Sequence, residues 1–188
     1  GPPCAAVPAW RLRFLIPLFA LCNVPVTFTG APRLFQRPLQ IYSEIFKGQG
    51  LVFQQEKNGL VVKGPLKSGS FVLAGNVSSQ FISGLLLALP LLETESTIRI
   101  KPPYESRDYG ELTRQAQALL GVNSEWLNET TLHIPGGQAY SPAHCRVEGD
   151  WSQGAVPAVL SALRGNIAIS GLKSDSSEGD KAVLDVLQ

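Results

Sequence analysis

The chain has 188 residues, of which 44% are hydrophobic and 16% charged. This length allows one domain, or one domain and part of a second, and the small charged share excludes charge-driven disorder. Sixteen Lys and Arg residues against fifteen Asp and Glu leave a formal net charge of +1. A general nucleic-acid binder carries a strongly basic surface, so we expect no nucleic-acid partner and only local anion sites.

The first apolar segment runs from Phe14 to Cys22 and follows Arg11 and Arg13, an arrangement that signal peptides share. The run is too short to cross a bilayer, and Leu21 is not the small residue that signal cleavage prefers. We therefore predict a buried helix over 13–21 and no membrane segment.

A strand over 26–29 and a second helix over 37–47 follow, with Pro38 expected in the first turn of that helix. Its apolar residues fall at helical spacing: Leu39, Ile41, Tyr42, Ile45 and Phe46. Strands over 51–55 and 60–63 flank an Asn-Gly pair, which predicts a hairpin.

The same order then recurs along the chain. Gly75–Pro90 aligns with Gly149–Arg164, which begins 74 residues later. In each copy a first helix is followed by a strand, a loop and a second helix. We place the later strands at 97–100, 130–134 and 166–169, and the later second helices at 108–120 and 179–187. Read cyclically, the repeated unit is βαβαββ, and the predicted fold class is α/β (α+β).

The start of the helix in 75–90 suggests an anion site. Helix N-termini offer unpaired N–H groups and partial positive charge, so Ser78 and Ser79 would complete a phosphate or carboxylate seat. The alternative is that a serine only caps the helix. Arg33 and Arg37, between a strand and a helix, either supply positive charge or are solvated surface residues.

The cysteines and histidines give no metal-binding pattern. Cys4, Cys22 and Cys145 are an odd number without a Cys-x-x-Cys pair, and His133 and His144 are the only histidines. We therefore expect no metal, no cofactor and a reducing, cytoplasmic location.

Four motifs in register resemble the 3-phosphoshikimate 1-carboxyvinyltransferase (5-enolpyruvylshikimate-3-phosphate synthase) family. They lie at Gly30–Pro38, Gly75–Pro90, Glu105–Tyr109 and Val147–Ser152. The likeness runs from about Arg11 to the end and covers less than half of such an enzyme.

The resemblance implies the enolpyruvate transferase fold, with two domains of three βαβαββ units each and substrates between them. Residues 1–146 would form most of one domain, and residues 147–188 the incomplete beginning of the other. The implied activity transfers the carboxyvinyl group of phosphoenolpyruvate to the 5-hydroxyl of shikimate 3-phosphate, a step of the shikimate pathway toward chorismate and the aromatic amino acids.

The resemblance also implies which residues bind these two substrates. Shikimate 3-phosphate would contact Ser78, Ser79, Gln80, Ser106 and Tyr109. Phosphoenolpyruvate would contact Arg33 and Gln80, with Arg13 and Arg37 as further candidates. The catalytic acid and base are expected outside this segment, so the other parts of the enzyme would be its partners.

Two departures from the family pattern stand near these positions. Val7–Arg11 stands where the family has a polar tract with a small flexible residue and a Thr or Ser. Ala9 replaces a glycine and Trp10 adds a ring where space is needed, which suggests that residues 1–10 are not native. Asp108 replaces a proline before Tyr109, which we expect to loosen that loop.

Two other functions stay open. A non-catalytic fragment that only binds anions is one, and the related UDP-N-acetylglucosamine 1-carboxyvinyltransferase is the other, although Ser-Ser-Gln-Phe and Glu-Ser-Arg favour the shikimate branch. Because the unit from Val147 lacks its hairpin and must expose apolar surface, we also predict self-association.

Overall fold

The computed structural model describes residues 4–6, 9–104, 107–165 and 167–187, and for residues 4–6, 9 and 10 it describes the backbone alone. The chain divides into two compact units, Gly1–Ser141 and Pro142–Gln188. Of the helices in these described ranges, none combines the length and apolar character needed to cross a membrane.

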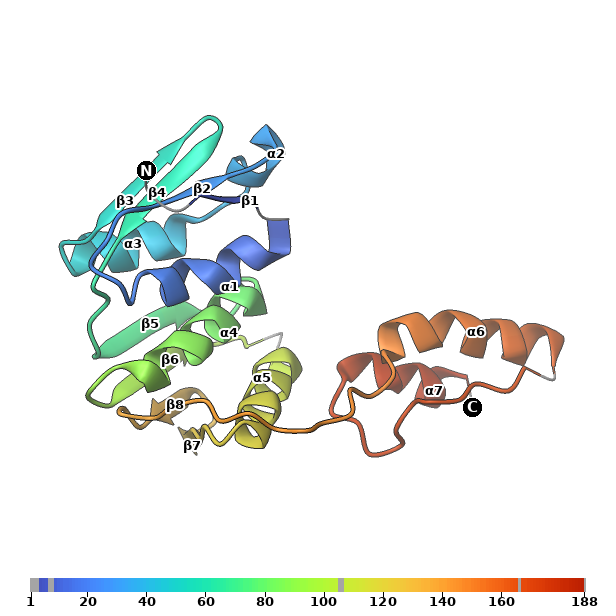
Figure 1. Ribbon diagram of the computed structural model, residues 1–188. Helices are drawn as coiled ribbons and strands as arrows, with labels where there is room; N and C mark the ends of the chain where they lie inside the picture. The colour runs from blue at the N-terminus through green and yellow to red at the C-terminus, as the bar shows by residue number, and fades with distance from the viewer. Residues whose placement is uncertain (1–3, 7–8, 105–106, 166, 188) are drawn as a thin grey trace. The chain divides into compact units, whose positions relative to one another are not determined.

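The first unit contains two copies of one arrangement (Figure 1). The first copy comprises β1 (Cys4–Ala6), α1 (Ala9–Phe19), β2 (Val26–Thr29), a short α2 (Pro32–Phe35), α3 (Gln40–Gly48), β3 (Val52–Glu56) and β4 (Gly59–Lys63). Its sheet has the order β1-β2-β4-β3, with β1 and β2 parallel and the other two pairs antiparallel.

The second copy repeats this order and this pairing. It comprises β5 (Ser70–Ala74), α4 (Ser79–Ala88), a 3-10 turn η1 (Leu89–Leu91), β6 (Ser96–Lys101), α5 (Arg107–Leu119), β7 (Glu125–Asn128) and β8 (Thr131–Ile134). Its sheet runs β5-β6-β8-β7, again with one parallel and two antiparallel pairs. The predicted βαβαββ unit and the α/β fold class are therefore confirmed.

Local sequence explains most of these elements. Lys57 and Asn58 form the turn between β3 and β4, as the Asn-Gly pair predicts. Leu60 and Val62 alternate with less buried neighbours along β4, and both are fully buried. On α3, Tyr42 and Phe46 lie on the buried face, one helical turn apart.

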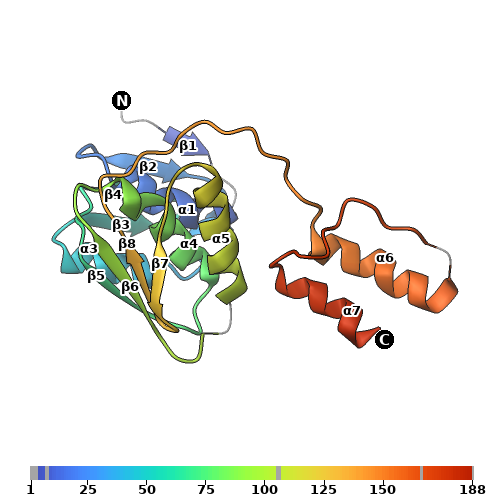
Figure 2. The same cartoon turned by 90° about the horizontal axis from the view of Figure 1, so that it is seen from below.

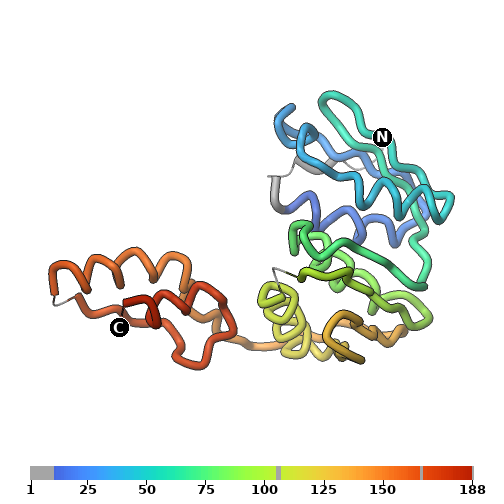
Figure 3. The backbone as a smooth tube through the Cα atoms, turned by 180° about the vertical axis from the view of Figure 1, so that it is seen from behind, coloured from blue at the N-terminus to red at the C-terminus, as the bar shows by residue number. Residues whose placement is uncertain are grey.

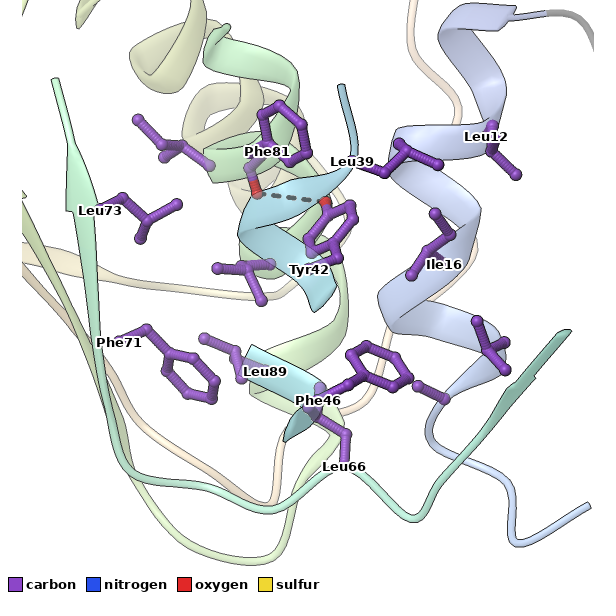
Figure 4. Close-up of a cluster of buried hydrophobic side chains, with 14 of the residues drawn as sticks. Leu12, Ile16, Leu39, Tyr42, Phe46, Leu66, Phe71, Leu73, Phe81 and Leu89 are labelled. Atoms are coloured by element: carbon purple, nitrogen blue, oxygen red, sulfur yellow. Dashed lines mark hydrogen bonds between the residues drawn. The ribbon is translucent and has the colours of Figure 1, made fainter. Parts of the chain in front are cut away.

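The core lies between the two sheets, where α1 and α4 pack against each other (Figures 1 and 2). Leu12 and Ile16 of α1 are fully buried there, and Phe81 of α4 is almost so. Figure 4 shows Tyr42 and Phe46 of α3 directed into the same cluster. Because the helices share one core, the two repeats form a single packed unit.

The second unit contains α6 (Trp151–Arg164), a 3-10 turn η2 (Gly179–Ala182) and α7 (Val183–Val186). Asp150 caps α6 by accepting from the Gln153 backbone N–H at 3.2 Å. The tube in Figure 3 shows the chain after α6 returning alongside that helix.

Several expected boundaries are wrong. Residues 167–169 are not a strand, since the described part of the second unit has no other strand with which they could pair; Asn166 lies outside the described residues. The helix predicted over 37–47 begins at Gln40, so Pro38 precedes it and the first turn is free of proline. The helix predicted over 179–187 is one 3-10 turn followed by a short α-helix.

Candidate functional site

The first unit gathers the starts of α1, α4 and α5 at one end, on the right of Figure 1. Each of α1 and α4 follows the first strand of a parallel pair, and such helices begin at the carboxyl ends of those strands. The loop after β5 is held against the loop after β6, because the Gly75 N–H donates to the Lys101 carbonyl at 2.8 Å. A Cβ at Gly75 would lie 2.1 Å from the Pro103 carbonyl oxygen, so only glycine allows this approach.

The close approach of these two loops fixes the chain just before α4 begins. Ser78 is the N-cap residue, with φ −56° and ψ 128°, yet its hydroxyl makes no capping hydrogen bond. Ser78 therefore occupies the N-cap position, as one of the two alternatives expected, but its side chain does not bond the helix. Ser79 and Gln80 begin the helix, where backbone N–H groups have no partner within the helix. All three residues are partly buried and lie where helix partial charge is positive.

Arg13 of α1 reaches this start of α4. Its Nη1 donates to the Gln80 Oε1 at 3.1 Å, and its Nη2 donates to the Pro38 carbonyl at 3.4 Å. The guanidinium also lies over the Phe81 ring, 4.7 Å from the ring centroid. Because arginine can only donate, the oxygen of the Gln80 amide must face it, which leaves the Gln80 Nε2 as a donor on the other side.

The charge at this point is positive. Burial lowers the pKa of Arg13 below its ordinary value, the nearby positive charge of Arg37 lowers it further, and Tyr42 acts in the opposite sense. Arginine nevertheless stays protonated in proteins, so Arg13 and Arg37 together supply a local cationic field. Arg37 itself is exposed, between α2 and α3.

A hollow of about 340 Å³ opens beside this contact. It is lined by Arg13, Pro38, Gln40, Ile41, Glu44, Val77, Ser78 and Phe81. Glu44 is its only acidic lining residue and accepts a hydrogen bond from Gln40 at 2.8 Å. The hollow thus joins an apolar wall to the guanidinium of Arg13 and the hydroxyl of Ser78.

The structure brings together some of the predicted site residues but not all of them. Arg33 lies on α2, is exposed and takes no part in the Arg13–Gln80 contact. Tyr109 lies in the first turn of α5 and is 55% exposed. Ser106 lies outside the described residues, whereas Asp108 occupies the first turn of α5, where a negative side chain favours the helix.

Sequence reasoning assigned no site role to Tyr42, which was expected only as a core residue. Its hydroxyl donates to the carbonyl of Arg13 at 2.6 Å and lies 3.3 Å from the carbonyl of Phe81. The sequence offers only a partial signal: Pro17, four residues after Arg13 in a helix, leaves the Arg13 carbonyl without its usual donor but does not identify Tyr42 as the replacement. No trio of His, Cys, Asp or Glu side chains within the described ranges could hold a metal ion.

The family model described as EPSP synthase (3-phosphoshikimate 1-carboxyvinyltransferase) matches residues 7–188. Proteins named 3-phosphoshikimate 1-carboxyvinyltransferase from Clostridium kluyveri and Clostridium beijerinckii are 41% and 44% identical over 179 residues, 94% of this chain. These matches cover 42% and 41% of the two relatives, so the chain spans about two fifths of their length.

Solved structures share the fold. An EPSP synthase from Acinetobacter baumannii superposes with a TM-score of 0.77 at 19% identity, covering 99% of this chain and 42% of that one. A second structure of an EPSP synthase from Acinetobacter baumannii gives a TM-score of 0.69 at 21% identity, covering 87% of this chain and 36% of the other. With a family match over nearly the whole sequence, the chain belongs to the EPSP synthase (3-phosphoshikimate 1-carboxyvinyltransferase) family.

Proposed function

We propose that this chain is the phosphate-binding part of a 3-phosphoshikimate 1-carboxyvinyltransferase. The reaction joins the 5-hydroxyl of shikimate 3-phosphate to the enolpyruvyl carbon of phosphoenolpyruvate. A tetrahedral adduct forms, phosphate leaves and the carboxyvinyl ether remains, as a step of the shikimate pathway. The support is the family match together with the anion-directed groups at the start of α4.

Both reactants are strongly anionic, so a binding site must supply donors and positive charge before the reaction begins. Ser78, Ser79 and the free N–H groups of α4 would seat the phosphate of shikimate 3-phosphate. The Gln80 Nε2, oriented by Arg13, would donate to the ligand. Arg37 would add to the positive potential.

The other site residues complete the proposal. Tyr109, exposed at the start of α5, and Ser106 would contact the same shikimate 3-phosphate. Arg33 would bind phosphoenolpyruvate with Gln80. The general acid, the general base and further cations would come from the parts of the relatives that this chain does not span, and residues 147–188 would begin the second domain of a cytoplasmic enzyme.

One observation carries the proposal: the hydroxyl of Ser78 makes no capping bond, and Arg13 fixes the Gln80 amide beside it. A serine whose only role was to cap α4 would use its hydroxyl on the helix. Here the hydroxyl, the amide nitrogen and the free backbone N–H groups remain for a ligand.

Calorimetric titration of the chain with shikimate 3-phosphate tests this proposal. Ser79→Ala should weaken binding about tenfold or more, because a hydrogen bond to a charged group is lost. Ser70→Ala is the matched control, since Ser70 is exposed at the opposite end of β5. Equal affinities for Ser79→Ala and the wild type would contradict the proposed seat.

The selectivity of the site for its ligand distinguishes a site for shikimate 3-phosphate from a site that binds any anion. The proposed site should bind shikimate 3-phosphate more tightly than inorganic phosphate or shikimate alone, since Gln80 and Tyr109 contact groups outside the phosphate. Equal affinity for shikimate 3-phosphate and inorganic phosphate would favour the non-catalytic anion binder.

A further inference from the structure

Pro17 leaves one backbone acceptor of α1 without its usual donor. In an α-helix the carbonyl of a residue accepts from the N–H four residues later. For Arg13 that residue is Pro17, which has no N–H and whose ring pushes the carbonyl away. Arg13 is partly buried, and a carbonyl that is shielded from water without a partner is costly, so another donor is favoured here.

The hydroxyl of Tyr42 supplies that donor from a different helix. It donates to the Arg13 carbonyl at 2.6 Å. It also lies 3.3 Å from the carbonyl of Phe81, the contact drawn as a dashed line in Figure 4. The hydroxyl has one proton, and the shorter distance assigns it mainly to Arg13. Tyr42 is fully buried, and burial raises its pKa well above 10, so it remains a donor at neutral pH.

Gly84 makes this meeting of three helices possible. A Cβ at Gly84 would lie 2.3 Å from the Tyr42 Oη, 2.5 Å from the Arg13 carbonyl oxygen and 3.3 Å from the Pro17 Cγ. At the point where α1, α3 and α4 meet, α4 therefore contributes no side chain. The Tyr42 hydroxyl fills the space that an alanine would take.

The two residues whose carbonyls lie near this hydroxyl also form the site. Arg13 is the residue that orients the Gln80 amide, and its guanidinium rests on the ring of Phe81. The Phe81 backbone directly follows Gln80. Because one rigid phenol lies against the carbonyls of Arg13 and Phe81, it fixes the distance between α1 and α4 at this point. The Arg13–Gln80 hydrogen bond forms across that distance.

We propose that Tyr42 is a positioning residue: by donating to the Arg13 carbonyl that Pro17 leaves unpartnered, it holds α1 against α4 so that Arg13 orients the Gln80 amide toward an anionic ligand. For the identity of that ligand, the inference rests on the proposed function. The arrangement of the helices stands without it.

The test uses Tyr42→Phe, which removes the hydroxyl and keeps the ring. In two-dimensional NMR spectra of the whole chain, the side-chain NH₂ signals of Gln80 should shift, because its contact with Arg13 loosens. Affinity for shikimate 3-phosphate should fall about fivefold, within the range of measured couplings between neighbouring residues. Tyr140→Phe is the matched control, since its hydroxyl donates to the Leu87 carbonyl at 2.9 Å, toward the other end of α4.

Pro17→Ala provides the decisive comparison, because alanine restores the N–H that the Arg13 carbonyl lacks. In the Pro17→Ala background, Tyr42→Phe should leave the Gln80 signals near their wild-type positions, with affinity within about twofold. If the Tyr42→Phe variant does not fold, the Gln80 signals of the variant that combines Pro17→Ala with Tyr42→Phe still test the inference. A merely structural tyrosine would lower the free energy of unfolding by the same amount in both backgrounds.

Two results would overturn the inference. Unmoved Gln80 signals in a folded Tyr42→Phe variant would show that the hydroxyl does not orient the amide. Equal displacement of these signals with and without Pro17 would show that the Arg13 carbonyl is not the group concerned. If wild-type chain does not bind shikimate 3-phosphate, the proposed function fails, whereas the Gln80 signals still decide the role of Tyr42.

Discussion

Gly84 is the residue on which the packing of α1, α3 and α4 depends most directly. Gly84→Ala would place a methyl group 2.3 Å from the Tyr42 Oη and 2.5 Å from the Arg13 carbonyl oxygen, and the second of these is backbone. We expect this overpacking to lower the free energy of unfolding by about 1–3 kcal/mol. Urea denaturation measures the change.

The matched control is Gly48→Ala at the end of α3, where an added Cβ meets nothing within 4 Å. Its effect should stay within about 0.5 kcal/mol, as at other surface positions. Equal losses for Gly48→Ala and Gly84→Ala would mean that the close approach at Gly84 does not limit stability.

Individual residues show how far the sequence could predict the site. Ser78, Ser79 and Gln80 could be selected because hydroxyl and amide groups at a helix start have a known chemistry. The hydroxyl of Tyr42 could not, since its role requires a proline in one helix, a glycine in another and their meeting in space. Periodicity shows only that Tyr42 is on an apolar face.

The strands of the second copy are linked on their surface by His133 of β8. Its Nε2 lies 3.0 Å from Glu95, just before β6, and its Nδ1 lies 3.2 Å from Glu125 of β7. The hydrogen bond to Glu95 is the main cause that raises the pKa of His133 above 6.5, with Glu125 adding to it and burial opposing it. The charged imidazole is thus favoured in the folded state.

NMR titration of the His133 ring signals should give a pKa above 6.5, and Glu95→Gln should lower that pKa. The stability gained from the raised pKa is fully present below pH 6.5 and is lost as the pH rises through the folded-state pKa. Glu129→Gln, in the exposed turn between β7 and β8, should leave the His133 pKa unchanged. A titration identical in all three proteins would contradict this account.

Among the elements, hydrophobic periodicity predicted the helices and the β3–β4 hairpin better than the edge strands. Neither Ser70–Ala74 nor Glu125–Asn128 was predicted, because short strands with exposed alternate residues carry little local signal. The strand expected near Ile169 had the right composition. It failed because pairing, which composition does not encode, decides whether a strand forms.

The second unit exposes an apolar stripe on α6. Val156, Val159, Leu160 and Leu163 follow helical spacing and are 72%, 40%, 49% and 76% exposed. The opposite face of α6, with Trp151 and Ala158, is buried. An uncovered stripe of this kind favours association between copies of the chain at high concentration.

Light scattering after size-exclusion chromatography should therefore show a mass that rises with protein concentration. Val156→Lys combined with Leu163→Lys should reduce this association, whereas Gln153→Lys, at a polar exposed position of the same helix, adds charge without removing apolar surface. A concentration-independent monomer in the wild type would contradict the prediction.

For the whole molecule, the central question is whether the first unit binds a phosphorylated metabolite at the start of α4. The most direct measurement is an amide chemical-shift titration of the chain with shikimate 3-phosphate and, separately, with shikimate. We expect shikimate 3-phosphate to shift the backbone amide signals of Ser78, Ser79 and Gln80 first, and shikimate to shift them far less. Unchanged amides at these three residues with millimolar shikimate 3-phosphate would contradict this expectation.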